Sequence, residues 1–130
     1  MYEGLTFARF AEAATRSIPK GAEPEHYRVV LDVGALNLGS EAGEVIGAIK
    51  DHLHFGKALD AADPKDSKGR LLRQRMKDEV GDVLWALNAV CVGGGGFSLE
   101  EAAQGNVEKL RKRYPSGFSE AAAQARMDER

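Results

Sequence analysis

Apolar side chains return every three to four positions along most of the chain, which is the period of an amphipathic α-helix. This spacing predicts helices over Leu5–Ser17, Glu25–Phe55 and Arg70–Val92, and a further helix from Ser98 to Tyr114. β-Branched residues are sparse and nowhere alternate with polar ones over the length of a strand. The chain is therefore expected to adopt an all-α fold.

Glycine and polar residues interrupt this pattern at three places. Leu38–Gly39–Ser40 predicts a break in the second segment, between two helices or within one bent helix, with Ser40 as an N-cap. The polar stretch 56–68 predicts a loop, and the four glycines at 93–96 predict the end of the third helix. Because these glycines lack the Lys-Ser/Thr that follows them in a phosphate-binding P-loop, they are interpreted as a flexible connector.

The C-terminal part of the chain begins with a clear helix signal. Ser98 lies three residues before Glu101, which is the spacing of a capping box. Pro115 and Gly117 then close the fourth helix. Residues 119–130 favour helix by composition but show little apolar face, so a peripheral helix or a frayed tail is expected.

Length, charge and cysteine content narrow the class of protein. With 130 residues the chain is long enough to bury a core, and we expect one domain over 1–130 with its core at about 5–119. A net charge of −2 argues against a general nucleic-acid binder, and no apolar stretch approaches the roughly 20 residues that span a bilayer. The single Cys91 allows no internal disulfide, and residues 1–4 lack the basic and apolar segments of a secretion signal. We expect a cytoplasmic protein with no nucleic-acid or membrane partner.

Two acidic motifs carry the candidate chemistry. Glu41 and Glu44 lie three residues apart on one predicted helix, and Glu79 and Asp82 lie three apart on another. Residues at this spacing share one side of a helix, and both pairs fall inside or beside the apolar stripe. Four inward-facing carboxylates would repel one another and lose hydration, so a cation must accompany them.

The cation is either a divalent metal or a set of nearby basic side chains, which are Lys50, Arg73, Arg75 and Lys77. All-oxygen ligands suit Mg²⁺ or Mn²⁺ better than Zn²⁺ or copper. Mg²⁺ held by few carboxylates usually completes its coordination with water and with phosphate oxygens of a substrate. A metal at this position therefore indicates a phosphate ester or a phosphoanhydride as the substrate.

Three sequence blocks surround these acids in a fixed order. They are Glu41-Ala42-Gly43-Glu44, then Glu79-Val80-Gly81-Asp82 with the following Val83-Leu84-Trp85, then the block from Asn106 to Phe118. In this order they resemble the MazG-like nucleoside triphosphate pyrophosphohydrolases of the all-α NTP pyrophosphatase superfamily, over roughly residues 5–119. Residues 45–78 separate the two motifs by more than the family usually shows, and the excess falls in the polar loop 58–69.

The resemblance implies a four- to five-helix bundle of this superfamily, completed by self-association into a dimer or tetramer. It implies hydrolysis of a nucleoside triphosphate to the monophosphate and pyrophosphate, with Mg²⁺ or Mn²⁺ held by Glu41, Glu44, Glu79 and Asp82 as metal ligands and catalytic residues. Two alternatives stay open: a non-catalytic helical module that binds a nucleotide or a protein, and a pyrophosphatase restricted to substrates such as dUTP or dCTP. Intact acids in both motifs favour an enzyme, because an inactive site has no reason to keep four repelling carboxylates.

Three polar residues form a second candidate group. Asn106, Lys109 and Arg113 lie on one face of the fourth predicted helix and are similar to the family's polar residues near the phosphates. A lysine and an arginine at these positions would hold triphosphate oxygens. The alternative interpretation is a solvated basic face.

Overall fold

The computed structural model describes residues 4–19, 26–63 and 66–128. Its α-helices are α1 (Phe7–Thr15), α2 (His26–Leu53), α3 (Leu72–Val90), α4 (Leu99–Arg113) and α5 (Glu120–Asp128), and the π-helical turn η1 (Cys91–Gly95) follows α3. Within the described ranges no β-strand forms, and only isolated bridges pair extended residues. The predicted all-α fold is confirmed, and the segment after residue 119 is a helix.

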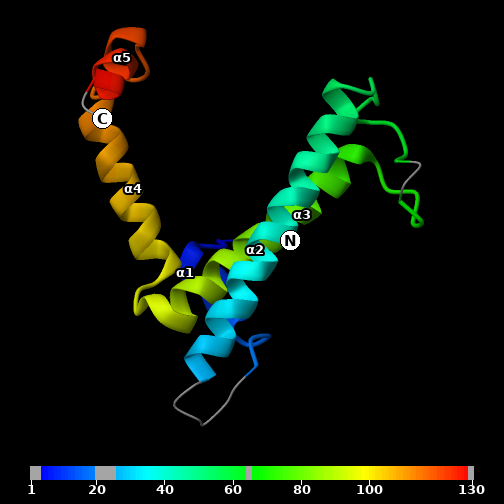
Figure 1. The fold of residues 1–130 in the computed structure, drawn as a ribbon, viewed down its shortest axis with the longest axis horizontal. Coiled ribbons are helices and arrows are strands. Elements are labelled where there is room, and N and C mark those ends of the chain that lie inside the picture. Colours follow the sequence, from blue (N-terminus) through cyan, green and yellow to red (C-terminus); the bar gives the residue numbers. More distant parts are fainter. Residues whose placement is uncertain (1–3, 20–25, 64–65, 129–130) are drawn as a thin grey trace.

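Figure 1 shows these helices arranged as a V. α2 and α3 lie side by side and antiparallel, and this pair is called the hairpin below. α1 packs against α3, and η1 packs against α2. α4 contacts α1 at the base of the V and carries α5, so these two helices form an arm, residues 99–128, that leans away from the hairpin.

α2 runs without interruption from His26 to Leu53. The predicted break at Leu38–Gly39–Ser40 is therefore wrong, and Ser40 lies inside the helix rather than at an N-cap. A glycine in a helix interior costs only about 1 kcal/mol relative to alanine, and packing along α3 outweighs that cost. The predicted start at Glu25 lies outside the described residues.

Two glycines let the base of the hairpin close tightly. A Cβ on Gly34 would lie 3.1 Å from the backbone nitrogen of Val90, and a Cβ on Gly93 would lie 2.7 Å from a side-chain carbon of Val30. A side chain at Gly34 would crowd the end of α3, and a side chain at Gly93 would crowd α2. The glycine run does not end the third helix at its first residue as predicted, because the chain continues through η1 and turns only at Gly96, whose φ is +66°.

The face of α2 that packs against α3 differs from the predicted apolar stripe. The buried residues of this helix are small or polar for the most part, and they are Val30, Gly34, Ala48 and Asp51. Large apolar side chains of the predicted stripe are exposed instead, and they are Val29, Val33, Leu36, Ile49 and Leu53. The predicted stripe is therefore only partly used for packing within one chain.

A small apolar cluster at the base of the V joins α1 to the hairpin. Ile18, Val30 and Ala89 are buried together, and Trp85 packs against them. The Trp85 indole nitrogen donates a hydrogen bond of 2.7 Å to the Ser17 hydroxyl. These contacts join the segment that follows α1 to α2 and α3.

α4 begins at the predicted capping box. The Ser98 hydroxyl accepts from the Glu101 amide, and the Glu101 carboxylate accepts from the Ser98 amide in return. Hydrogen bonds from the Ser98 backbone and side chain to the carboxylate lower the pKa of Glu101. Among the described residues no single helix is long and apolar enough to cross a bilayer. Leu72–Gly95 and Leu99–Arg113 together have the length and composition of a membrane span, but they are bent by 102° relative to each other.

Candidate metal centre

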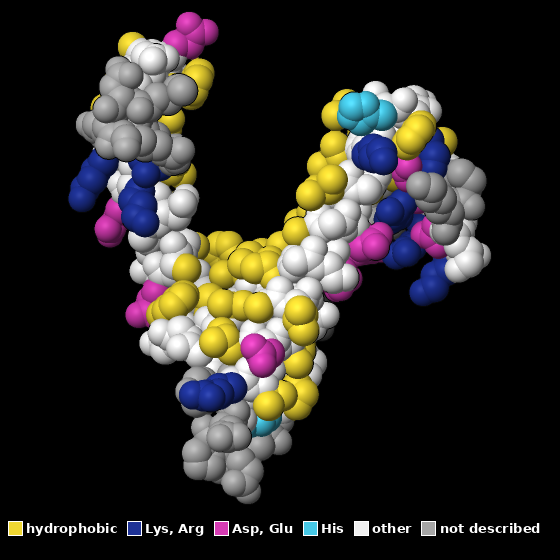
Figure 2. Space-filling view, in the orientation of Figure 1, with side chains coloured by type: hydrophobic (Ala, Val, Ile, Leu, Met, Phe, Trp, Pro, Cys, Tyr) yellow, Lys and Arg dark blue, Asp and Glu magenta, His cyan; other side chains and the backbone are white. Residues whose placement is uncertain are grey.

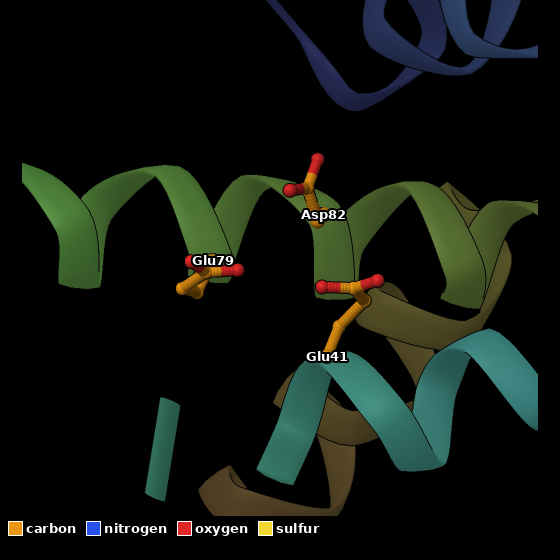
Figure 3. A group of neighbouring side chains, drawn as sticks. All are labelled: Glu41, Glu79 and Asp82. Atoms are coloured by element: carbon orange, nitrogen blue, oxygen red, sulfur yellow. The ribbon is translucent and has the colours of Figure 1, made fainter. Parts of the chain in front are cut away.

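The hairpin brings the two acidic motifs together. Glu41 on α2 extends toward the part of α3 that carries Glu79 and Asp82 (Figure 3). One carboxylate oxygen from each of the three side chains lies within 4.8 Å of the other two. We call these three residues the acid cluster. The spacing of three residues on α3 places Glu79 and Asp82 on one side of that helix, where α2 can meet both.

The acid cluster is electrostatically strained. Burial raises the pKa of Glu79 above its ordinary value of 4.5, and repulsion from Glu41, Glu44 and Asp82 raises it further. Arg75 opposes this rise in pKa, but more weakly. In the part of the chain that the structure describes, no lysine or arginine forms an ion pair with a member of the cluster. The three carboxylates therefore have the spacing and the net charge of a cation site.

Glu44 does not belong to this group of three. Its carboxylate Oε2 lies 3.5 Å from Nη2 of Arg75, and 56% of its side chain is exposed. Asp82 is also exposed, whereas Glu41 and Glu79 are half-buried, so the predicted inward orientation of the acids holds for only two of them. The inward orientation was predicted from the position of the acids relative to the apolar stripes of the two helices, and these stripes are themselves partly exposed.

Basic residues account for only part of the acidic charge. Of the four predicted partners, Arg75 pairs with Glu44, whereas Arg73 pairs with Asp60 at 2.8 Å in the loop. Lys50 lies over the ring of Phe55, 5.6 Å from its centroid. The salt-bridge interpretation therefore applies to Glu44 and not to the acid cluster.

The long loop between the motifs is ordered by buried charges that the sequence analysis missed. Asp51 and Asp63 are each 2% exposed. Arg75 Nη1 donates to Asp63 at 2.7 Å and lies 3.4 Å from Asp51, and Lys57 approaches the same two carboxylates at 3.2 Å from Asp51 and 3.8 Å from Asp63. Asp51 follows Glu44 by seven residues and so lies on the same face of α2. This spacing is the feature of the sequence that could have indicated a role for Asp51.

A second group of ion pairs fastens the far part of the loop to α3. Arg70 bonds both Asp66 in the loop and Asp78 on the helix. The backbone of the loop also pairs with the start of α3, where Leu72 donates to the carbonyl of Ala61. The described part of the loop between the motifs is thus tied to the end of α2 and to the first turns of α3.

The structure does not bring the second candidate group to the first. Asn106, Lys109 and Arg113 are all exposed on α4. Figure 1 shows this helix leaning away from the hairpin that carries the acid cluster. Within one chain these residues form a solvated face.

The ligand atoms of the acid cluster are carboxylate oxygens alone. This donor set fits Mg²⁺ or Mn²⁺, which prefer hard oxygen ligands, and lacks the imidazole and thiolate ligands typical of Zn²⁺ or copper sites. A family model described as the MazG nucleotide pyrophosphohydrolase domain matches residues 34–118. This range includes both acidic motifs, the loop between them and the three polar residues of α4. No curated protein and no solved structure matches the chain significantly.

Proposed function

The chain belongs to the MazG nucleotide pyrophosphohydrolase family, and on this basis we propose that it hydrolyses nucleoside triphosphates to monophosphates and pyrophosphate. We further propose that the reaction requires Mg²⁺, with Mn²⁺ as a substitute. Glu41, Glu79 and Asp82 are the proposed core ligands, and Glu44 joins them.

The observation that carries this proposal is the convergence of the acid cluster. Residues from two motifs that are far apart in the sequence meet with their oxygens within 4.8 Å, and no basic side chain of the described residues neutralises them. Such an arrangement costs stability unless a cation binds, because like charges and partial burial both disfavour the ionised form. A cation-dependent function explains why the cluster is kept.

When bound, Mg²⁺ supplies neutralisation of phosphate charge and lowers the pKa of a coordinated water. The chain supplies the rest. Glu41, Glu79 and Asp82, on two packed helices, would hold the metal that meets the phosphates, and one of these carboxylates would accept the proton of the attacking water. Glu41 and Glu79 are half-buried, whereas Asp82 is exposed to solvent.

The arm contributes to the proposed site only when the chain self-associates. Figure 2 shows hydrophobic side chains gathered in the hollow of the V, between the arm and the hairpin. Leu36 is 76% exposed and Ile46 is 65% exposed on α2, and Val107 and Leu110 on α4 are each nearly half exposed. We propose that a second copy covers these residues in a dimer or tetramer, and that Asn106, Lys109 and Arg113 reach the phosphates in that assembly.

Pyrophosphate and phosphate release from a panel of ribo- and deoxynucleoside triphosphates tests the reaction. Metal-dependent pyrophosphate release is expected in wild type, with loss in EDTA and in Glu79→Gln, whereas Glu108→Gln, which changes an exposed acid on α4, should retain activity. Turnover of dUTP or dCTP alone would identify a restricted pyrophosphatase. Absence of turnover on every nucleotide, with Mg²⁺ still raising the melting temperature, would refute the enzyme and leave a binding module.

Sedimentation velocity tests the assembly. Wild type is expected to sediment as a dimer or tetramer at micromolar concentration, and Leu36→Glu is expected to shift it toward the monomer, because a charge would be buried in the apolar contact. A wild-type monomer at that concentration would contradict the proposed assembly.

A further inference from the structure

Arg75 lies between two sets of carboxylates. Its Nη1 donates to Asp63 at 2.7 Å and lies 3.4 Å from Asp51, and its Nη2 faces Glu44 at 3.5 Å. The guanidinium therefore uses one nitrogen for the buried acids, Asp51 on α2 and Asp63 in the loop, and the other for an acid of the first motif. Its planar fork allows this division, which a point charge such as an ammonium group cannot reproduce.

The acids that the two terminal nitrogens of Arg75 contact differ in their exposure to solvent. The side chains of Asp51 and Asp63 are 2% and 0% exposed, and their buried charges hold Arg75 in place together with Lys57, which also approaches both carboxylates. The side chain of Glu44 is 56% exposed and can turn into solvent at little cost. Arg75 is thus the fixed member of its pair with Glu44, and Glu44 is the movable one.

The backbone of α2 adds to this fixation. Arg75 Nη2 lies beside Gly47, where a Cβ would be 3.7 Å from that nitrogen. Gly47 is one turn after Glu44 and one turn before Asp51, so Arg75 crosses α2 along the face that carries both acids. Helix α2 and the loop together determine the direction of the guanidinium.

We infer that Arg75 is a positioning residue that competes with the divalent cation for Glu44. This inference rests on the proposed metal-dependent function. The pairing with Nη2 holds the Glu44 carboxylate beside the acid cluster but outside the group of three oxygens. Glu44 becomes a ligand by leaving Arg75, and the buried aspartates keep Arg75 from following it.

The direction of the expected effect separates this role from a purely structural one. If Arg75 merely supported the fold, its replacement would loosen the site and weaken cation binding. If it competes for Glu44, a replacement that keeps the buried charge compensated but cannot reach Glu44 must tighten cation binding. Arg75→Lys is such a replacement, because one ammonium group can serve Asp51 and Asp63 but has no second nitrogen.

Binding of Mn²⁺ alone to the full-length protein, followed by electron paramagnetic resonance without nucleotide, provides the test. Arg75→Lys is expected to bind Mn²⁺ about two- to fivefold more tightly than wild type, since partly exposed ion pairs contribute free energies of that size. Adding Glu44→Gln to Arg75→Lys should remove the gain. Arg73→Lys is the matched control, because Arg73 also pairs with the loop but does not contact Glu44, and it should bind like wild type.

Unchanged or weaker Mn²⁺ binding in Arg75→Lys would overturn the inference while leaving the metal centre intact. Absence of Mn²⁺ binding in wild type would overturn the metal centre itself, and the inference with it. A second measurement avoids dependence on the folding of the variant. In wild type labelled with ¹⁵N-arginine, Mg²⁺ should shift the guanidinium resonances of Arg75, and an equal shift in Glu44→Gln would contradict the competition.

Discussion

Replacing Glu79 by glutamine should stabilise the protein when no divalent cation is present. Glu79 is the member of the acid cluster whose pKa is raised by burial and by three neighbouring carboxylates. Glutamine has nearly the same shape and no charge, so the substitution removes the repulsion and keeps the packing. Enzyme active sites often show this exchange of stability for function.

The size of the effect follows from the geometry of the cluster. Two unit charges separated by about 4–5 Å repel by about 1 kcal/mol in a water-like dielectric. Within the cluster Glu79 faces Glu41 and Asp82 at such distances. Because solvent screens all three, we expect a gain of about 1–2 kcal/mol, which corresponds to a rise in melting temperature of about 3–8 °C for a domain of this size.

Thermal unfolding followed by circular dichroism, with EDTA and again with Mg²⁺, measures this effect. Wild type should be less stable than Glu79→Gln in EDTA and should gain from Mg²⁺, whereas the variant should gain little. Glu108→Gln serves as the control, because this exposed acid is not a member of the cluster. A variant that melts below wild type in EDTA, or that gains from Mg²⁺ as much as wild type does, would show that the repulsion argument is wrong.

Further predictions concern pH, the buried charges and the glycine contact. The pKa of Glu79 is raised above 4.5 in the folded chain, so the folded state binds a proton more readily than the unfolded state. Lowering the pH from 7 toward about 5 in EDTA should therefore raise the melting temperature of wild type but not that of Glu79→Gln. Asp63→Asn should lower the free energy of unfolding in urea by about 3 kcal/mol, because it breaks a buried charge network, whereas Asp60→Asn, which alters an exposed pair, should leave the urea midpoint nearly unchanged. Gly93→Ala should destabilise the protein by about 1–3 kcal/mol, since its Cβ would lie 2.7 Å from a side-chain carbon of α2. Gly105→Ala, where a Cβ meets nothing within 4 Å, should instead stabilise α4 by up to about 1 kcal/mol in the same urea titration.

The sequence predicted those structural features that depend on residues close together along the chain. The capping box of Ser98 and Glu101 appears as expected, because both hydrogen bonds join residues three apart. The spacing within the second acidic motif correctly placed Glu79 and Asp82 on one side of α3. The break at Ser40 was wrong because helix propensity weighs glycine alone, whereas packing against α3 determines whether α2 continues.

Features that depend on distant residues could not be predicted in this way. Arg75 was one of four basic residues named as possible partners of the acids, but the first motif does not indicate that Arg75 is the one that contacts Glu44. The burial of Asp63 depends on the same arginine and on the course of the loop. The position of the arm depends on contacts between α4 and α1, which helical periodicity does not encode.

The separation of arm and hairpin has a consequence for hydrogen exchange. α4 packs only against α1 and α5 among the major contacts, while α2 and α3 pack against each other along their length and are joined by a loop fixed by buried ion pairs. Amides of the arm should therefore open in a local event that leaves the hairpin protected, and the acid cluster belongs to the slowly exchanging unit. In an isolated chain, the carboxylates would keep their geometry while the arm frays. Assembly would then slow exchange mainly in the arm, because that part gains the most protection from a neighbouring molecule.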